Sequence, residues 1–334
     1  MTFSIIMAAY NRKDILVKAI EKIMEMDYPK ANYEIIVGDN NSTDGTPQKM
    51  KEFSVKNKTK MNLKYLIEKR KGNIYARHSA VKHATGKYLV FCDDDCFVEK
   101  NWLSEIERVF NKFPQIGLLG TRIEILWNKT PPSWIKKYQS YLGEISGSEG
   151  VTIKETGLLV NSGSMAIPRE LFKTIKGTNP EQVDDFYVGD GETGLCKKLH
   201  RLKIPIAFTN DTFVCHYQTV EKNASESDIA RRSYNNGISV AYNESVILKK
   251  DTLDETIEYE RQVKKERVIK FWKYLTKDSR RKLSFDLNFI RGKIEYLNAL
   301  KSNTALIKSM SLNDWIYDEK YCAPELAEQI NLNS

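Results

Sequence analysis

The chain has 334 residues, a formal net charge of +8, and 41% hydrophobic, 10% aromatic and 29% charged residues. This composition is typical of a globular protein with a buried core, and it excludes a disordered or fibrous chain. No run of about 18 apolar residues occurs, so we expect no membrane-spanning helix. The five cysteines follow no disulfide spacing, which favours reduced thiols and a cytoplasmic protein.

The first 125 residues alternate short apolar runs with amphipathic patterns. The apolar runs predict buried parallel strands, and the amphipathic stretches predict helices. This alternation predicts an α/β fold with a mostly parallel, Rossmann-like sheet flanked by helices. We expect strands at 3–9, 33–38, 63–68, 88–92 and 116–125, and helices at 14–26, 73–84 and 102–113.

The pattern changes twice further along the chain. Residues 127–157 contain scattered Pro and Gly and predict an irregular region. A strand at 158–167 and helices at 191–202 and 225–243 follow, and beyond residue 249 the spacing of apolar residues predicts long helices. We therefore expect one domain over 1–245, with halves at 1–125 and 126–245, and a helical extension over 246–334.

The extension carries the net charge of the protein. Residues 261–293 contain twelve Lys or Arg against three Asp or Glu. Such a basic stripe attracts anionic surfaces, including lipid head groups. No nucleic-acid recognition motif accompanies it, so we expect no nucleic-acid partner. The alternatives of a membrane surface, a subunit contact in a homo-oligomer and a merely solvated helix remain open.

Polar clusters follow three of the predicted strands at the point where each strand ends. These clusters are Tyr10-Asn11-Arg12, the stretch 39–45, and Asp93-Asp94-Asp95. Ligands of open α/β sheets bind at the carboxyl ends of the strands. The three clusters therefore predict a single binding site.

Three consecutive carboxylates after the buried run YLVFC are costly, because each raises the pKa of its neighbours unless a cation is present. A divalent cation with oxygen ligands removes that cost, and open coordination positions can then bind phosphates. The alternative is a solvated acidic turn. In the second cluster, Asp39 can accept hydrogen bonds from a base or ribose. Asn41, Ser42 and Asp44 are ordinary turn formers.

Taken in order, these stretches resemble family-2 glycosyltransferases of the GT-A fold. The resemblance covers about residues 1–220 and is carried by SIIMAAYNR (4–12), EIIVGDNNSTDGT (34–46), KGNIYARHSAVKHATGKYLVFCDDDC (71–96) and, more loosely, SGSMAIPRELF (162–172) and VGDGETGLCKKL (188–199). It implies an inverting, metal-dependent transfer from a nucleotide sugar, with UDP as the default nucleotide. The first half of the domain would bind the nucleotide and the second half the acceptor.

The resemblance also assigns residues. It implies nucleotide binding by Ala9, Tyr10, Arg12, Asp39, Gly72, Arg77, Asp93 and Asp94. Asp93 and Asp95 correspond to the DxD pair, and His216 resembles a further ligand to Mn²⁺ or Mg²⁺. A histidine after a strand is otherwise more often structural.

The candidate base lies at the start of a predicted helix. Family members often carry two adjacent acids here, and Gly191 replaces the first of them if Glu192 is aligned with the second. Glu192 is then the candidate base and Asp190 the alternative, because a helix N-terminus favours an ionised carboxylate. The competing interpretation is a capping acid.

The acceptor side is less specific. Trp134, Gly163 and Ser164 are expected there, although Trp134 could equally be a packing residue. The resemblance implies a glycan or polyprenyl-diphosphate-linked acceptor, which places the protein peripherally at the inner face of the cell membrane. Rival classes are a nucleotidyltransferase, whose Gly-rich phosphate loop is missing from AAYNRKD, and a non-catalytic sugar-nucleotide-binding protein.

Overall fold

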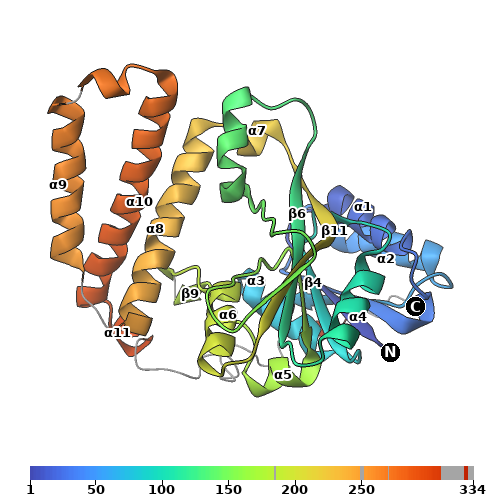
Figure 1. The fold of residues 1–334 in the computed structure, drawn as a ribbon. Helices are drawn as coiled ribbons and strands as arrows, with labels where there is room; N and C mark the ends of the chain where they lie inside the picture. The colour runs from blue at the N-terminus through green and yellow to red at the C-terminus, as the bar shows by residue number, and fades with distance from the viewer. Residues whose placement is uncertain (184–185, 249–251, 270, 310–326, 330–334) are drawn as a thin grey trace.

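The computed structural model describes residues 1–183, 186–248, 252–269, 271–309 and 327–329, and its central feature is a ten-stranded sheet (Figure 1). The strand order is β12-β3-β2-β1-β4-β8-β6-β11-β5, with β7 paired to β11. The strands are β1 (Phe3–Ala9), β2 (Tyr33–Asp39), β3 (Leu63–Glu68), β4 (Tyr88–Cys92), β5 (Cys96–Val98), β6 (Leu118–Trp127), β7 (Val151–Lys154), β8 (Ser164–Pro168), β11 (Ile206–Gln218) and β12 (Ala327–Gln329).

Six of these strands, β1, β2, β3, β4, β6 and β11, run in one direction, because β8 pairs antiparallel with both β4 and β6. The register aligns Ala9 at the end of β1 with Asp39 at the end of β2. The polar segments after these strands therefore meet at one edge. This arrangement confirms the predicted α/β class and its mostly parallel sheet.

Helices cover both faces of the sheet. Alternate residues of β1 belong to different layers: Ile5 is part of the hydrophobic cluster that includes residues of α1, α2 and α4, and Ile6 is part of the cluster that includes residues of α3, α5 and α6. Both residues are fully buried, as expected for a central parallel strand. The helices are α1 (Lys13–Met24), α2 (Thr46–Asn57), α3 (Asn73–Lys82), α4 (Trp102–Lys112), α5 (Arg169–Thr174) and α6 (Gly191–Arg201). Of these, α2 and α5 were not predicted.

The second half of the sheet contains elements that the sequence did not indicate. The 13-residue strand β11 was not predicted, and only the last part of the strand expected at 158–167 forms, as β8. The region 127–157 is more regular than expected, because it contains the 3₁₀ helix η2 (Ser133–Leu142) and β7. A separate two-stranded sheet joins β9 (Gln182–Val183) and β10 (Phe186–Tyr187).

The C-terminal region is helical, as expected, in its described part. It consists of α7 (Val220–Asn223), α8 (Glu226–Leu248), α9 (Leu253–Ile269), η3 (Phe271–Tyr274), α10 (Lys277–Ser302) and α11 (Thr304–Ser309). The expected domain boundary at 245 falls in the last turn of α8. Residues 310–326 and 330–334 of the expected extension lie outside the described part.

The helix α10 runs along α8, while α9 lies on the outer side of α10 (Figure 1). The two packed helices touch backbone to backbone at two glycines. A Cβ on Gly237 would lie 2.0 Å from the carbonyl oxygen of Phe289, and one on Gly292 would lie 2.0 Å from that of Tyr234. Only glycine permits this approach, so α10 is fixed to α8 by close packing. Among the described helices, none combines the length and apolar character needed to cross a bilayer.

Candidate functional site

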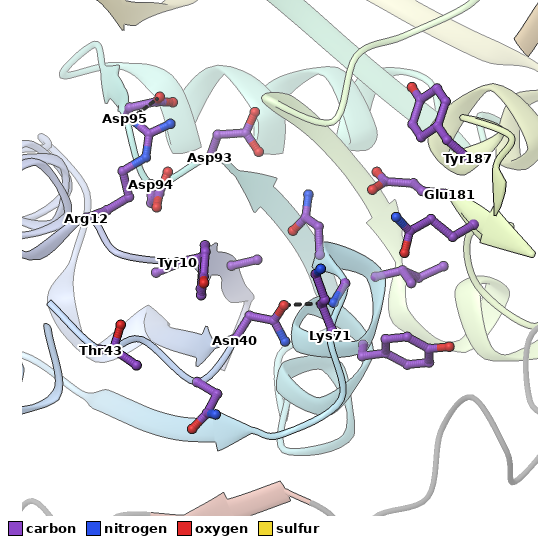
Figure 2. Close-up of a pocket in the computed structure, with 18 of the residues that line it drawn as sticks. Tyr10, Arg12, Asn40, Thr43, Lys71, Asp93, Asp94, Asp95, Glu181 and Tyr187 are labelled. Carbon is purple, nitrogen blue, oxygen red and sulfur yellow. Dashed lines mark hydrogen bonds and ion pairs between the residues drawn. The ribbon is translucent and has the colours of Figure 1, made fainter. Parts of the chain in front are cut away.

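A cleft of about 830 Å³ opens at the carboxyl edge of the parallel strands (Figure 2). The loops after β1, β2, β3 and β4 form one wall, and residues from the β9–β10 sheet, β11, α7 and α8 form the other. Such an edge is the usual ligand position in open α/β sheets. The cleft is lined by Ala8, Ala9, Tyr10, Arg12, Asn40, Asn41, Thr43, Lys69, Lys71, Gly72, Asn73, Ile74, Tyr75, Asp93, Asp94, Asp95, Glu181, Gln182, Tyr187, His216, Gln218, Asn223 and Arg232.

The first wall is held together by Asn40. Its side-chain nitrogen donates to the carbonyl oxygens of Glu68 and Arg70, at 3.2 and 2.5 Å, and its oxygen accepts the Gly72 N–H at 2.8 Å. Gly72 has φ +137°, a conformation that favours glycine. These bonds connect the loop after β2 to the loop after β3, and Lys71 lies beside this junction (Figure 2).

The predicted nucleotide-binding residues of this wall lie at different depths. Ala9 is buried at the cleft, and the side chain of Tyr10 is exposed in it. Asp39 is fully buried and is not among the lining residues. Its carboxylate accepts hydrogen bonds from the Ser42 N–H, at 2.7 Å, and from the Tyr65 hydroxyl. In this structure Asp39 therefore fixes the loop that carries Asn40 and Asn41 towards the cleft.

The three consecutive acids have three different environments. Asp93 forms an ion pair with the buried Arg77 of α3. Burial and the neighbouring Asp95 raise the pKa of Asp94 to about 8. Asp95 contacts Arg12 Nη1 at 3.2 Å, so the loop after β1 and the loop after β4 meet through these two residues.

Asp95 also contacts His216, which β11 brings from a distant part of the sequence. His216 Nε2 lies 3.2 Å from Asp95 Oδ1. Burial alone would lower the pKa of His216, but the bond to Asp95 raises it above its usual value. Burial raises the pKa of Asp95, yet His216 and Arg12 bring it below its usual value.

These side chains fit a divalent cation. Donor atoms of Asp93, Asp95 and Cys96 lie within 4.8 Å of one another, and His216 Nε2 is adjacent. Carboxylate oxygens with an imidazole are donors that Mn²⁺ accepts. The structure thus places two of the predicted metal ligands, Asp93 and Asp95, in one group, and the third, His216, in contact with Asp95.

The predicted acids near the start of α6 lie behind the cleft. Asp190 is 3% exposed, and its carboxylate accepts a hydrogen bond from Asn179 Nδ2 at 2.5 Å. Burial raises the pKa of Glu192, while the nearby Arg77 lowers it. Glu192 is therefore coupled by charge to the Arg77–Asp93 pair, whereas Asp190 is bonded to the segment before β9.

Several cleft residues were missed by the sequence reasoning, because no motif marks them. Glu181 lines the cleft opposite Asp93 (Figure 2). Arg232 reaches the cleft from α8 and donates to Tyr141 O at 3.3 Å and Asn223 Oδ1 at 3.0 Å. The remaining unpredicted residues of this wall are Gln182, Tyr187, Gln218 and Asn223.

The three residues expected on the acceptor side have separate positions. Gly163 lies next to the acids, since a Cβ there would be 3.3 Å from Asp93 Oδ2. Ser164 is fully buried and bonds to Trp102 Nε1 at 2.9 Å. Trp134 packs between η2 and α10, with the Arg281 guanidinium 4.7 Å from its ring centroid.

Residues 4–176 match the model of a protein family described as "Glycosyl transferase family 2". Glycosyltransferase AglE of Haloferax volcanii is 25% identical over 216 residues, which cover 64% of this chain and 66% of the relative. The glucosyltransferase WfgD of Escherichia coli, named for UDP-Glc and α-D-GlcNAc-diphosphoundecaprenol, is 37% identical over 28% of this chain and 34% of its own length. The chain thus spans less than two thirds of these relatives.

Two solved structures share the fold. The mannosyltransferase PcManGT of Pyrobaculum calidifontis, in complex with GDP-Man and Mn²⁺, superposes with a TM-score of 0.61 at 18% identity, covering 88% of this chain and 86% of that one. GalNAc-T7 with UDP, GalNAc and Mn²⁺ gives a TM-score of 0.57 at 17% identity, covering 92% of this chain and 57% of that one. The architecture is therefore of the GT-A type.

Proposed function

Because the chain belongs to glycosyl transferase family 2, we propose that it transfers a sugar from a nucleoside diphosphate sugar to an acceptor hydroxyl. The observation that carries the proposal is the group of Asp93, Asp95 and His216 at the head of the cleft. A nucleotidyltransferase and a non-catalytic binding protein remain the weaker alternatives. Neither class requires the buried acids Asp190 and Glu192 at the start of α6.

The first wall provides the donor site. Tyr10 offers an exposed ring for a base, and Asn40, Asn41 and Thr43 offer polar atoms around it. Arg12 and Lys71 provide positive charge for a diphosphate. UDP is the nucleotide we propose, and the buried Asp39 would act on it through the loop that it supports.

The proposed reaction is a single displacement that inverts the anomeric centre. Glu192 is the proposed base that accepts the proton of the attacking hydroxyl, and Asp190 is the less favoured candidate because Asn179 already donates to one of its carboxylate oxygens. Arg12 and Arg232 would stabilise the charge that develops on the leaving diphosphate. Mn²⁺ or Mg²⁺, held by Asp93, Asp95 and His216, would neutralise part of that charge when bound.

Nucleotide release tests the proposal. The protein is incubated with Mn²⁺ and, separately, with UDP-Glc, UDP-GlcNAc and GDP-Man, and liberated UDP or GDP is measured with water or a short-chain prenyl-diphosphate-linked GlcNAc as acceptor. We expect one donor to be consumed, and mass spectrometry should show the sugar on the acceptor. A protein that neither binds UDP or GDP with Mn²⁺ nor consumes any donor would contradict the proposal.

We further propose a lipid-linked acceptor and a peripheral membrane contact. The described residues around the turn between α9 and α10, 264–269 and 271–280, project from the side of the molecule where η2 and α7 also lie (Figure 1). Among the described side chains of this hairpin tip, Val268 is 78% exposed and Leu275 48% exposed. Exposed cations surround them, namely Lys264, Lys265, Arg267, Lys273, Lys277 and Arg280. Apolar side chains among cations are typical of surfaces that bind anionic bilayers.

Flotation with liposomes tests this contact. The wild type should float with vesicles that contain anionic lipid at low salt, and reversal of four tip charges should abolish flotation. A control with four reversals on α2 and the residue that follows it has the same net charge as the tip variant. The tip variant is K265E/R267E/K277E/R280E, and the control is K49E/K51E/K56E/K58E. Absence of flotation in the wild type would contradict the membrane contact.

A further inference from the structure

Glu181 is an acid of the cleft that no sequence pattern indicated. It precedes β9, and its carboxylate points into the space in front of Asp93 (Figure 2). Glu181 lines the cleft, whereas Glu192 and Asp190 do not. A molecule in the cleft would therefore meet the carboxylate of Glu181 before it meets the acids of α6.

The backbone fixes Glu181 relative to the start of α6. Its carbonyl oxygen accepts the N–H groups of Val188 and Gly189, at 2.8 and 3.0 Å. The β9–β10 pairing and the bond from Asn179 N to Gly191 O, at 3.3 Å, hold the same segment. The position of Glu181 is thus set by several hydrogen bonds and not by a flexible loop.

Glu181 packs beside Gly191. A Cβ at residue 191 would lie 3.5 Å from Glu181 Oε1 and 3.6 Å from its Cγ. Gly191 also has φ +26°, which disfavours any side chain there. The carboxylate of Glu181 therefore lies beside the missing side chain of residue 191, adjacent in the chain to Glu192. Glu181 and Glu192, from two segments of the protein, both act on the charge of Arg77, and we refer to them as a pair.

This pair shares its counter-charge with Asp93. Arg77 is buried, and the acids that act on it are Asp93, Glu181 and Glu192. Burial raises the pKa of Glu181 and of Glu192, although Arg77 opposes the shift at both.

We propose that Glu181 is a second catalytic carboxylate, which binds the attacking hydroxyl and shares its proton with Glu192. The inference rests on the proposed sugar transfer. As the acceptor oxygen forms its bond to the anomeric carbon, its proton passes to the Glu181–Glu192 pair. The bond between the anomeric carbon and the diphosphate oxygen breaks at the same time, and its electron pair leaves with the diphosphate.

A purely structural role for Glu181 predicts something different. If Glu181 only balanced the charge of Arg77, then Glu181→Gln would alter stability and the Arg77–Asp93 geometry, and UDP binding would weaken with it. A role at the nucleophile lowers turnover while UDP binding is retained. The two roles are therefore separated by measuring turnover and UDP affinity on the same variants.

The experiment compares Glu181→Gln, Glu192→Gln, the double variant and the exposed control Glu155→Gln. Nucleotide release is followed with UDP-Glc, UDP-GlcNAc and GDP-Man, water being the nucleophile, and UDP binding with Mn²⁺ is measured by calorimetry. We expect each single variant of the pair to lose roughly 100-fold in turnover, the usual scale for a group that takes a proton. The UDP Kd should change less than threefold, and Glu155→Gln should match the wild type.

The double variant distinguishes a pair from two independent groups. If the carboxylates share one proton, the double variant should lose far less than the product of the single losses. Either wild-type turnover in Glu181→Gln or a loss of UDP binding equal to its loss of turnover would overturn the role of Glu181. The proposed function would stand in both cases. If the wild type consumes no donor and binds no nucleotide, the proposed function falls, and the role of Glu181 falls with it.

Discussion

The two walls of the cleft are built in different ways. The first wall consists of loops that follow the neighbouring strands β1, β2, β3 and β4, so parallel register alone brings Tyr10, Asn40 and Asp93 together. The second wall combines the β9–β10 pair, the strand β11 and the helices α7 and α8. Its residues Glu181, His216 and Arg232 meet only through tertiary packing. The first wall is therefore determined locally, whereas the second depends on how the C-terminal helices dock.

This difference assigns separate tasks to the walls. In the proposed reaction the first wall provides groups for the nucleotide and shares the metal with His216 of the second wall. The second wall would provide Glu181 and Arg232 towards the reacting sugar and the acceptor. Variants of Asp95, of the second wall and of the α8–α10 packing should therefore differ in their effects on turnover, UDP binding and stability.

The largest effect is expected where the walls meet, at Asp95. Asp95→Asn removes a charge that contacts both Arg12 and His216. We expect nucleotide release to fall roughly 100- to 1000-fold, since a bound metal contributes several kcal/mol to charge stabilisation. Mn²⁺-dependent UDP binding should be lost in the same variant, and EDTA should reproduce both effects in the wild type. The exposed control Asp254→Asn should behave as the wild type, and full activity of Asp95→Asn would remove the metal from the proposed reaction.

The next effect tests the acids at the start of α6, which lie behind the cleft. Glu192→Gln should lower sugar transfer roughly 100-fold, because a neutral amide cannot accept the proton. UDP affinity should be unchanged, since the nucleotide contacts the first wall. Asp190→Asn provides the comparison: it retains an acceptor for the hydrogen bond from Asn179, and turnover should decrease much less. If the two losses were reversed, Asp190 would be the base.

A smaller effect is expected at Arg232, the cation that α8 contributes. Arg232→Ala should weaken binding of UDP with Mn²⁺ about tenfold, because charge-assisted hydrogen bonds contribute roughly 1.5–3 kcal/mol. The neighbouring Arg231 is exposed and does not line the cleft, so Arg231→Ala is a matched control. Equal UDP affinity in both variants, measured by calorimetry, would show that the diphosphate lies away from α8.

The first wall could be predicted from the sequence better than the second wall. The β1, β2, β3 and β4 strands are short apolar runs with clear ends, so their positions and the Asp93–Asp95 cluster were predictable from hydrophobic pattern alone. The strand β11 was missed because Asn210 and Asp211 interrupt its apolar pattern, and the register of β11 against β6 shifts between Thr209 and Phe213. Helix α2 buries Met50 and Phe53, but its third large apolar residue, Val55, is exposed, which weakens its periodicity.

Site residues of the second wall could be found only in part. His216 in this wall, and Glu192 behind it, were indicated by the resemblance to a family. Glu181 was not, because its position depends on hydrogen bonds to Val188 and Gly189 that no local pattern encodes. Long-range pairing of this kind is decided by packing and cannot be deduced from periodicity or spacing in one sequence.

The packing that supports the second wall leads to the last prediction. Gly237→Ala would place a Cβ 2.0 Å from the carbonyl oxygen of Phe289, so α8 and α10 would have to separate. Overpacking of this kind costs about 1–3 kcal/mol, and the urea midpoint should fall accordingly. Asn236→Ala, at an exposed neighbouring position of α8, should leave the midpoint unchanged or slightly raised, because alanine favours a helix. An unchanged midpoint in Gly237→Ala would show that α10 is only loosely attached to α8. The second wall would then be positioned by η2 and the β9–β10 pair alone.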